Sequence, residues 1–267
     1  MSFLNKTKLS DFDWLINECS NYVQIDKPIA IDSVKGYIDL LKNGKPVSNT
    51  NAIKKLENRW YQSLTSKPDY AVYSHPMYIC DVWICWSFYS NKSIKAIINP
   101  KSLMNRSVAN YLGSCKKVLD LGCGFGFTTA CLKEIFPQAN VYGTNIKDSW
   151  QYNICEKISK QYGFNVLEDS KPIGNVDLIF ASEYFEHIEN SLEHLHEVIT
   201  NHRPRMLVVA NGYNGTAIGH FNYYKYKNKK YTAKQTSLDF GKMMRHLGYQ
   251  KLKTKIWNNR PAIWVKV

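Results

Sequence analysis

A glycine-rich turn between an apolar strand and a helix constrains this chain more than any other feature. Residues 118–126 read VLDLGCGFG. Glycine permits positive φ and lets a ligand approach the backbone closely, because it has no Cβ. A helix that opens at this turn adds free N–H groups and the positive end of its dipole. The turn therefore predicts an α/β sheet that binds a ligand at the carboxyl end of its first strand.

The spacing of the glycines argues against a dinucleotide ligand. A dinucleotide fingerprint is Gly-x-Gly-x-x-Gly, whereas here the third glycine, Gly126, comes one residue early and is followed by Phe127. Asp120 precedes the turn and would repel a pyrophosphate, but its carboxylate can accept hydrogen bonds from an ammonium group. This combination favours a zwitterionic amino-acid ligand that carries a nucleoside.

Strand and helix patterns alternate from Lys116 onward, which indicates a parallel sheet with crossover helices. We expect strands at residues 116–121, 140–145, 165–168, 176–181 and 206–210, and helices at residues 126–136, 149–162 (ended by Gly163) and 191–200. The remainder predicts a basic hairpin at residues 221–226 and 230–232, a helix at residues 237–247, and an antiparallel pair at residues 250–257 and 262–267.

The first part of the chain has a different character. Residues 1–110 predict a mainly helical extension or lid, in which residues 51–64 have clear helical spacing. Residues 111–267 then form the ligand-binding domain with its basic C-terminal part.

Residues 116–210 resemble the core of the class I S-adenosylmethionine-dependent methyltransferases, in the turn quoted above and in the order of the segments after it. The resemblance implies a Rossmann-like α/β fold and S-adenosylmethionine as cofactor. The cofactor-binding residues that it implies are Asp120, Gly122, Cys123, Gly124, Gly126, Asn145, Ile146, Asp169 and Ser182. That family has an acidic residue for the ribose hydroxyls where this chain has Asn145. Ile146 is expected to pack on the adenine, and Asp169 to accept from its amino group.

Carboxylates and histidines gather after the predicted fourth strand, where residues 183–187 read EYFEH. The resemblance places this segment below the cofactor sulfur, and one helical turn would bring its charged residues to one face. The candidate catalytic residues are Glu183, Glu186, His187 and the later His220.

Three interpretations of these four residues remain open. They orient or deprotonate the acceptor, they hold a divalent Mg or Mn ion, or they are structural. Their spacing resembles the metal site of 2′-O-methyltransferases that act on small-RNA 3′ ends. Metal-free relatives of the ubiquinone-biosynthesis type carry the same Glu-x-x-Glu-His. Asn211 and Tyr213, in the loop after the fifth strand, are further candidates for contacting an acceptor hydroxyl or amine.

The basic charge of the chain is concentrated at its end. Residues 202–267 hold 14 Lys and Arg but one acidic residue, Asp239, and this net +13 equals the net charge of the whole chain. Such a field favours nucleic acid or another polyanion as partner. The alternative is a solvated hairpin whose lysines protect it from edge pairing.

These features together predict a methyltransferase that acts on an O or N acceptor, with nucleic acid or another anion as substrate. The alternatives are a small-molecule methyltransferase of the ubiquinone-biosynthesis type and a cofactor-binding, nucleic-acid-associated protein without turnover. Neither the Asp/Asn-Pro-Pro-Tyr/Trp motif of amino-methylating DNA enzymes nor a Pro-Cys nucleophile occurs. No membrane-spanning or signal-like run is visible, and seven scattered Cys without a Cys-x-x-Cys pair fit a reducing, cytoplasmic setting.

Overall fold

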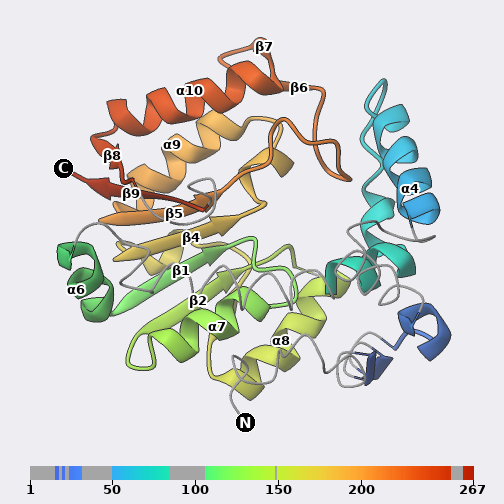
Figure 1. The fold of residues 1–267 in the computed structure, drawn as a ribbon, viewed down its shortest axis with the longest axis horizontal. Helices are drawn as coiled ribbons and strands as arrows, with labels where there is room; N and C mark the ends of the chain where they lie inside the picture. The colour runs from blue at the N-terminus through green and yellow to red at the C-terminus, as the bar shows by residue number, and fades with distance from the viewer. Residues whose placement is uncertain are drawn as a thin grey trace. The chain divides into compact units, whose positions relative to one another are not determined.

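The computed structural model describes residues 16–17, 20–21, 24–31, 50–83, 106–147, 149–253 and 261–267 (Figure 1). The chain divides into two units. One comprises Met1–Tyr89 with Thr216–Gly219, and the other comprises Ser90–Gly215 with His220–Val267. The domain division expected at residue 110, and the role of the first part as a lid, stay predictions.

The first unit contains the helix expected near residues 51–64. This helix, α4 (Thr50–Ser63), is followed by the 3-10 helix η1 (Tyr70–Ser74). Trp60 is completely buried, and its ring lies 5.6 Å from that of Tyr70 and 6.1 Å from that of Tyr73. Aromatic packing thus joins α4 to η1.

The second unit is built on a seven-stranded sheet with the order β3-β2-β1-β4-β5-β9-β8. The first five strands in this order are parallel, whereas β9 is antiparallel to β5 and β8 is antiparallel to β9. The predicted Rossmann-like sheet with an antiparallel C-terminal strand is therefore confirmed. Its strands are β1 (Lys117–Leu121), β2 (Asn140–Thr144), β3 (Asn165–Leu167), β4 (Leu178–Ser182), β5 (Met206–Ala210), β8 (Tyr249–Lys251) and β9 (Ala262–Lys266).

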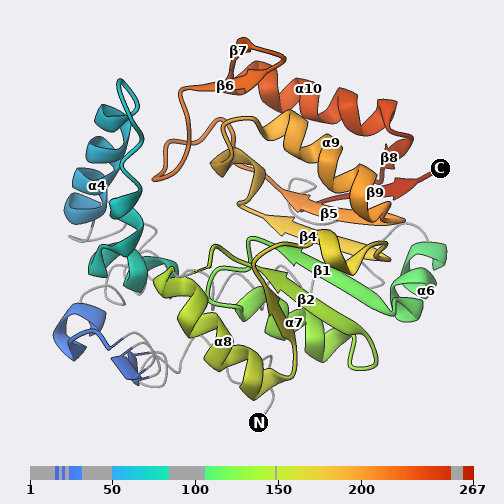
Figure 2. The same cartoon turned by 180° about the vertical axis from the view of Figure 1, so that it is seen from behind.

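Helices connect and cover these strands. In Figures 1 and 2, α7 and α8 lie at the β2 side of the sheet, and α9 and α10 lie at the side of β5 and β8. The helices of this unit are α6 (Arg106–Ser114), α7 (Phe127–Ile135), α8 (Trp150–Tyr162), α9 (Ser191–His202) and α10 (Ala233–His246), with short 3-10 turns η2 (Lys171–Ile173) and η3 (Phe185–His187). Helix α8 has the predicted ends, because Ser149 caps its first turn and Gly163 adopts a left-handed conformation after its last.

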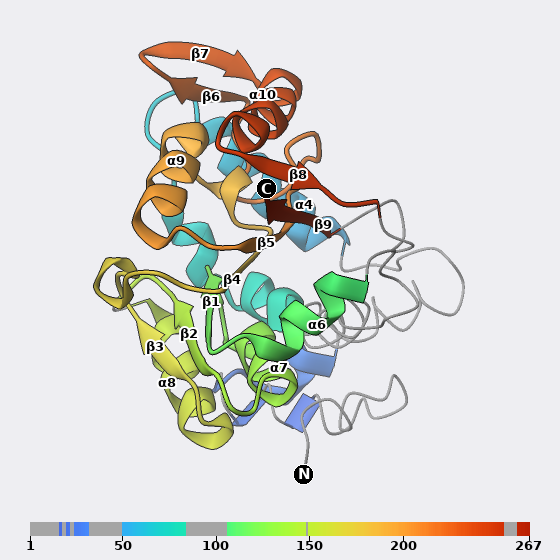
Figure 3. The ribbon, with the colours of Figure 1, turned by 90° about the vertical axis from the view of Figure 1, so that its left-hand side faces the viewer.

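The basic hairpin forms a separate two-stranded sheet, β6 (Tyr223–Tyr226) and β7 (Lys229–Thr232), which Figure 3 shows beside α10. Its two turn residues, Lys227 and Asn228, both have positive φ, which is typical of a tight type I′ turn. Helix α10 begins at Ala233, four residues before the predicted start. The reason is that Thr232 caps it by accepting a hydrogen bond from the Gln235 N–H.

The parallel strands bring four loops to one edge of the sheet. Leu121 at the end of β1 pairs with Ala181 of β4, and Ser182 at the end of β4 pairs with Ala210 of β5. The loops that follow β1, β2, β4 and β5 therefore start at the same edge, where ligands of such sheets bind. Among the helices of the described ranges, none is long and apolar enough to cross a membrane.

Candidate active site

The loop after β1 has the conformation that its glycines allow. Gly122, Gly124 and Gly126 have φ of 68°, 55° and 90°. The Cys123 N–H donates to the Thr144 carbonyl at 2.9 Å and thereby joins the loop to the end of β2. Helix α7 starts directly after Gly126, so its first N–H groups lie at this edge of the sheet. The loop can therefore hold the carboxylate or another polar part of a ligand against bare backbone.

Asp120 lies at the base of this loop and is almost completely buried. Its carboxylate accepts hydrogen bonds from the hydroxyls of Thr128 and Thr129, at 2.5 and 2.6 Å. Burial raises the pKa of Asp120 to about 7, against the effect of the two hydroxyls. Asp120 thus fixes the first turn of α7 to β1, and its expected contact with a ligand ammonium stays a prediction.

Asn145 connects the loop after β2 to the glycine loop, a role that the sequence did not reveal. Its side-chain N–H donates to the Gly124 carbonyl at 2.6 Å, and its side-chain oxygen accepts from the Ile146 N–H at 2.8 Å. The Ile146 side chain is 79% exposed, which leaves an apolar surface beside this connection. The amide therefore holds in place the backbone of the loop expected to contact the methionine part of the ligand.

The other two expected cofactor residues lie on neighbouring elements. Ser182 is buried at the end of β4. Asp169 is exposed after β3, and its carboxylate accepts from the Lys171 N–H at 3.0 Å. Their contacts with a cofactor stay predictions.

Three of the four candidate catalytic residues come together. One ligand atom from each of Glu183, His187 and His220 lies within 4.8 Å of the other two. The two imidazole rings cross at 80° with centroids 4.9 Å apart. Burial, and then His220, lower the pKa of His187 to about 3, so its ring is neutral at physiological pH. We call Glu183, His187 and His220 the carboxylate–histidine cluster.

The cluster does not arise from the single helical turn that the sequence suggested. The 3-10 helix η3 begins at Phe185, so Glu183 lies outside it. Glu183 has a φ of 49°, in the left-handed region that non-glycine residues rarely adopt, and its N–H donates to the Ala210 carbonyl at 2.7 Å. Strained residues of this kind concentrate at functional sites.

Glu186 has a different environment from the cluster. It is completely buried, and one carboxylate oxygen accepts a hydrogen bond from the Gly212 N–H. The other oxygen is buried with no hydrogen-bond partner in the described part of the chain. Burial, and then the charge of Glu183, raise the pKa of Glu186 to about 8. Glu186 therefore joins the loop after β4 to the loop after β5.

The orientation of His220 is set by the backbone. Its Nδ1 lies 2.8 Å from the Gly215 carbonyl oxygen. Because a carbonyl can only accept, Nδ1 carries the proton and Nε2 carries the lone pair. A ring held in this way presents an acceptor nitrogen in a fixed direction, as metal-binding histidines do.

The two residues expected after β5 differ from each other. Tyr213 is buried and its hydroxyl lies 2.5 Å from the Ser191 hydroxyl, so it packs in the core, and its expected contact with an acceptor stays a prediction. The side-chain oxygen of Asn211 is buried and has no hydrogen-bond partner among the described residues. Asn211 thus remains a candidate for contacting a donor group.

Comparisons with known proteins agree with the fold of the second unit. Residues 119–207 match the family profile described as a methyltransferase domain. A trans-aconitate 2-methyltransferase of Rhodopseudomonas palustris strain HaA2 is 34% identical over 86 residues, which cover 32% of this chain and 33% of that protein. The same-named protein of strain BisB5 is 31% identical over 87 residues, which cover 32% of this chain. The matched stretch thus spans about a third of these relatives.

A solved structure supports the fold. It is described as an O-methyltransferase family protein from Burkholderia thailandensis, and it covers 90% of this chain and 70% of its own, with a TM-score of 0.52 and 10% identity. At this identity the similarity concerns the architecture alone.

Proposed function

Residues 119–207 are a methyltransferase domain of the class I, S-adenosylmethionine-dependent type, and on that premise we propose that this protein transfers a methyl group to an oxygen or nitrogen acceptor. The observation that carries the proposal is the position of the carboxylate–histidine cluster. Glu183 and His187 follow β4 at the sheet edge where the glycine loop follows β1, and His220 joins them from the segment after β5. A cofactor in the loop would therefore have titratable side chains on the acceptor side.

The described residues fit S-adenosylmethionine. The backbone of the glycine loop and the first turn of α7 would take the methionine part, and the exposed Ile146 would cover an adenine. Asn145 stands where the family has a carboxylate that binds the ribose hydroxyls. Its side-chain nitrogen and oxygen already form hydrogen bonds with the backbone of Gly124 and Ile146. We therefore expect Asn145 to act on the cofactor chiefly through the loop that it holds.

The chemistry requires alignment more than covalent help from the protein. When bound, the cofactor would supply an electrophilic methyl group on a sulfonium. An acceptor lone pair would then bond to the methyl carbon as the carbon–sulfur bond breaks, and the acceptor proton would be released. The ring of His187 stays neutral, and because burial lowers its pKa to about 3 it would orient the acceptor by a hydrogen bond and would not store its proton, while the cluster and the loop would hold the two reactants in line. The sulfonium loses its positive charge in the reaction. Nearby carboxylates therefore stabilise the bound cofactor more than the transition state, and they contribute to binding more than to the rate.

We further propose that the cluster holds a divalent cation, Mg²⁺ or Mn²⁺. Two observations support this ligand set. A carboxylate and two imidazoles lie within 4.8 Å, and the backbone fixes His220 with Nε2 as its acceptor nitrogen. Carboxylate ligands suit these ions, and Mn²⁺ also accepts imidazole nitrogen. A cation there would lower the pKa of an acceptor hydroxyl.

Transfer of label tests the main proposal. The protein is incubated with methyl-labelled S-adenosylmethionine and, separately, with total nucleic acid, a small-molecule extract and total protein. We expect label in one fraction, and calorimetric binding of S-adenosylhomocysteine. Binding without label in any fraction would favour the alternative of a cofactor-binding protein without turnover, and absence of binding would refute the proposal.

We propose nucleic acid as the anionic partner of the basic C-terminal part. The hairpin residues Lys229 and Lys230 are exposed, and the C-terminal part carries little acidic charge to offset them. Lysines in such a position contact phosphates. The competing candidate is a small anion, because aconitate, named in the relatives of this domain, is a tricarboxylate.

Reversing these two charges separates the candidates. The double substitution Lys229→Glu/Lys230→Glu should weaken binding of single-stranded RNA and reduce the slope of log K against log salt by about 1.4, since each lost phosphate contact removes about 0.7. Anisotropy titrations at several salt concentrations measure the affinity and its salt dependence. The matched control is Lys157→Glu/Lys160→Glu on α8, where both lysines are also exposed. Equal slopes for the two variants would contradict a phosphate contact at the hairpin.

A further inference from the structure

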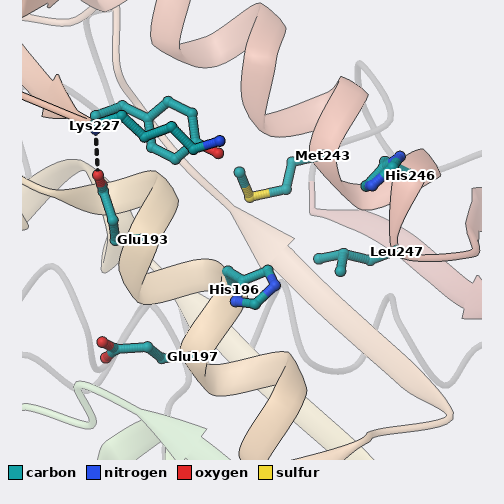
Figure 4. A pocket seen from close by; sticks show the side chains of 8 residues that line it. Glu193, His196, Glu197, Lys227, Met243, His246 and Leu247 are labelled. Carbon is teal, nitrogen blue, oxygen red and sulfur yellow. Dashed lines mark hydrogen bonds between the residues drawn. The ribbon is translucent and has the colours of Figure 1, made fainter. Parts of the chain in front are cut away.

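A cavity lies between α9, the β6–β7 turn and the C-terminal end of α10, and none of its lining residues belongs to the carboxylate–histidine cluster (Figure 4). Its volume is about 430 Å³, which falls within the range of roughly 300–1,000 Å³ usual for small-ligand sites. Methyl transfer as proposed above makes no use of it. Its lining combines ring and apolar side chains with two carboxylates, those of Glu193 and Glu197.

The hairpin turn is fixed over α9 and closes one end of this cavity. The Lys227 N–H donates to a carboxylate oxygen of Glu193 at 2.6 Å, the bond drawn in Figure 4. Lys225 adds two contacts to Glu189, one from its N–H to the carbonyl at 2.8 Å and one from its ammonium to the carboxylate at 3.0 Å. These contacts hold the hairpin turn against α9 and the residues before it, and they define one side of the cavity.

Glu193 lines the cavity and has one carboxylate oxygen that could accept a hydrogen bond from a ligand. Its second carboxylate oxygen, Oε2, is buried and has no hydrogen-bond partner among the described residues. A buried acceptor without a donor costs about 1–3 kcal/mol. Glu197 does not fill the same role, because its carboxylate lies 3.9 Å from His194 and points away from Met243 in Figure 4. The cavity therefore fits a ligand with an N–H group that reaches Glu193.

The remaining lining suits a flat, partly apolar ligand. Tyr226 from the hairpin and His246 from α10 contribute rings, and Met243 and Leu247 contribute apolar surface. In Figure 4, Met243 lies above His196 and His246 lies beside it. Rings and thioether groups of this kind pack against the faces of nucleobases.

The surface around the cavity suits phosphates. Exposed cationic side chains come from the hairpin and from α10. Lys225 and Lys242 are paired with Glu189 and Asp239, so the cations that could contact phosphates are Lys229, Lys230 and Arg245. The single acidic residue on α10, Asp239, is paired with Lys242 at 2.9 Å. A ligand with a neutral ring, an amino group and an attached phosphate chain matches this distribution.

We propose that this cavity binds one base of a single-stranded nucleic acid, and that the base carries an exocyclic amino group. The amino group would donate to Oε2 of Glu193, and the flanking phosphates would lie against the lysines of the hairpin. The proposal rests on the nucleic-acid partner proposed above and specifies which base is preferred. Uracil is disfavoured, because it presents a carbonyl oxygen where cytosine presents the amino group.

Binding of two homopolymers tests the preference without any methyl transfer. Anisotropy titrations of the full chain with labelled oligo(C) and oligo(U) RNA twelve-mers should give about tenfold tighter binding of oligo(C), since one buried acceptor is satisfied. The substitution Glu193→Gln should reverse this ratio, because its oxygen can still accept from the Lys227 N–H while its NH₂ replaces Oε2 and donates to uracil O4. Glu156→Gln on α8 makes the same charge change at an exposed site and should leave the ratio unchanged.

A second variant guards against misfolding of the first. Met243→Trp fills the cavity and should bring the ratio close to one without changing the salt slope. Equal affinities of the original protein for both oligomers would overturn the cavity proposal and leave the nucleic-acid partner in place. Binding of neither oligomer would refute both. A preference for oligo(C) that survives Glu193→Gln would overturn the role of the carboxylate.

Discussion

The substitution Gly126→Ala is expected to lower the stability of the second unit strongly and to weaken the binding of its cofactor. Gly126 has a φ of 90°, and a Cβ built there would lie 2.7 Å from Phe164 Cζ and 2.9 Å from Cys155 Sγ. Both neighbours are buried and have little room to move. The expected loss is roughly 2–5 kcal/mol, from about 1–2 for the left-handed backbone and about 1–3 for overpacking.

Urea unfolding measures this loss, and calorimetry with S-adenosylhomocysteine measures the effect on the loop. The matched control is Gly163→Ala at the end of α8. Gly163 has a similarly positive φ of 74°, but a Cβ there would meet no described atom within 4 Å. The Gly163→Ala variant should therefore lose only about 1–2 kcal/mol of stability, the cost of a left-handed backbone, and it should keep its affinity for S-adenosylhomocysteine. Equal losses of stability in the two variants would show that close packing at Gly126 contributes nothing.

The parts of the fold that local rules govern were predictable from the sequence. The glycine loop and the ends of α8 follow from residues that determine their own backbone, such as Gly126, Ser149 and Gly163. The parallel order of the first five strands follows from their alternation with helices. The sequence did not predict that α10 starts at Ala233, because the hydrophobic pattern does not mark this position. The start is set by the side chain of Thr232, which caps the helix.

The site was predictable as a set of residues but not in its internal arrangement. Spacing alone placed Glu183 and Glu186 on one face, whereas the structure directs one to the cluster and the other to the Gly212 N–H. That choice depends on the loop after β5, which lies far away in the sequence. Asn145 is similar, because its contact with Gly124 exists only once β1 and β2 are paired. Local patterns carry no information about such contacts between loops.

The substitution His220→Asn is expected to lower the rate of methyl transfer about 100-fold or more, the usual effect of removing a proton-transfer group or a metal ligand with its bound ion. Asparagine removes the acceptor nitrogen that the Gly215 carbonyl holds in place. If the cluster binds a cation, chelation should lower the rate of the unaltered protein, and Mn²⁺ should restore it. The variant should show neither response, and calorimetry should detect Mn²⁺ binding only to the unaltered protein.

His202 offers a matched control for this loss. It is also buried, and its Nδ1 lies 2.8 Å from a glycine carbonyl, that of Gly174. Its other ring nitrogen is bonded to the Ser170 hydroxyl at 2.8 Å, so the ring is a structural connection outside the cluster. His202→Asn should therefore lower the free energy of unfolding but keep the response to chelator and Mn²⁺. If the unaltered protein ignores chelator while His220→Asn still slows the reaction, His220 positions the acceptor or its base and holds no ion. An unchanged rate in His220→Asn would remove the cluster from the chemistry altogether.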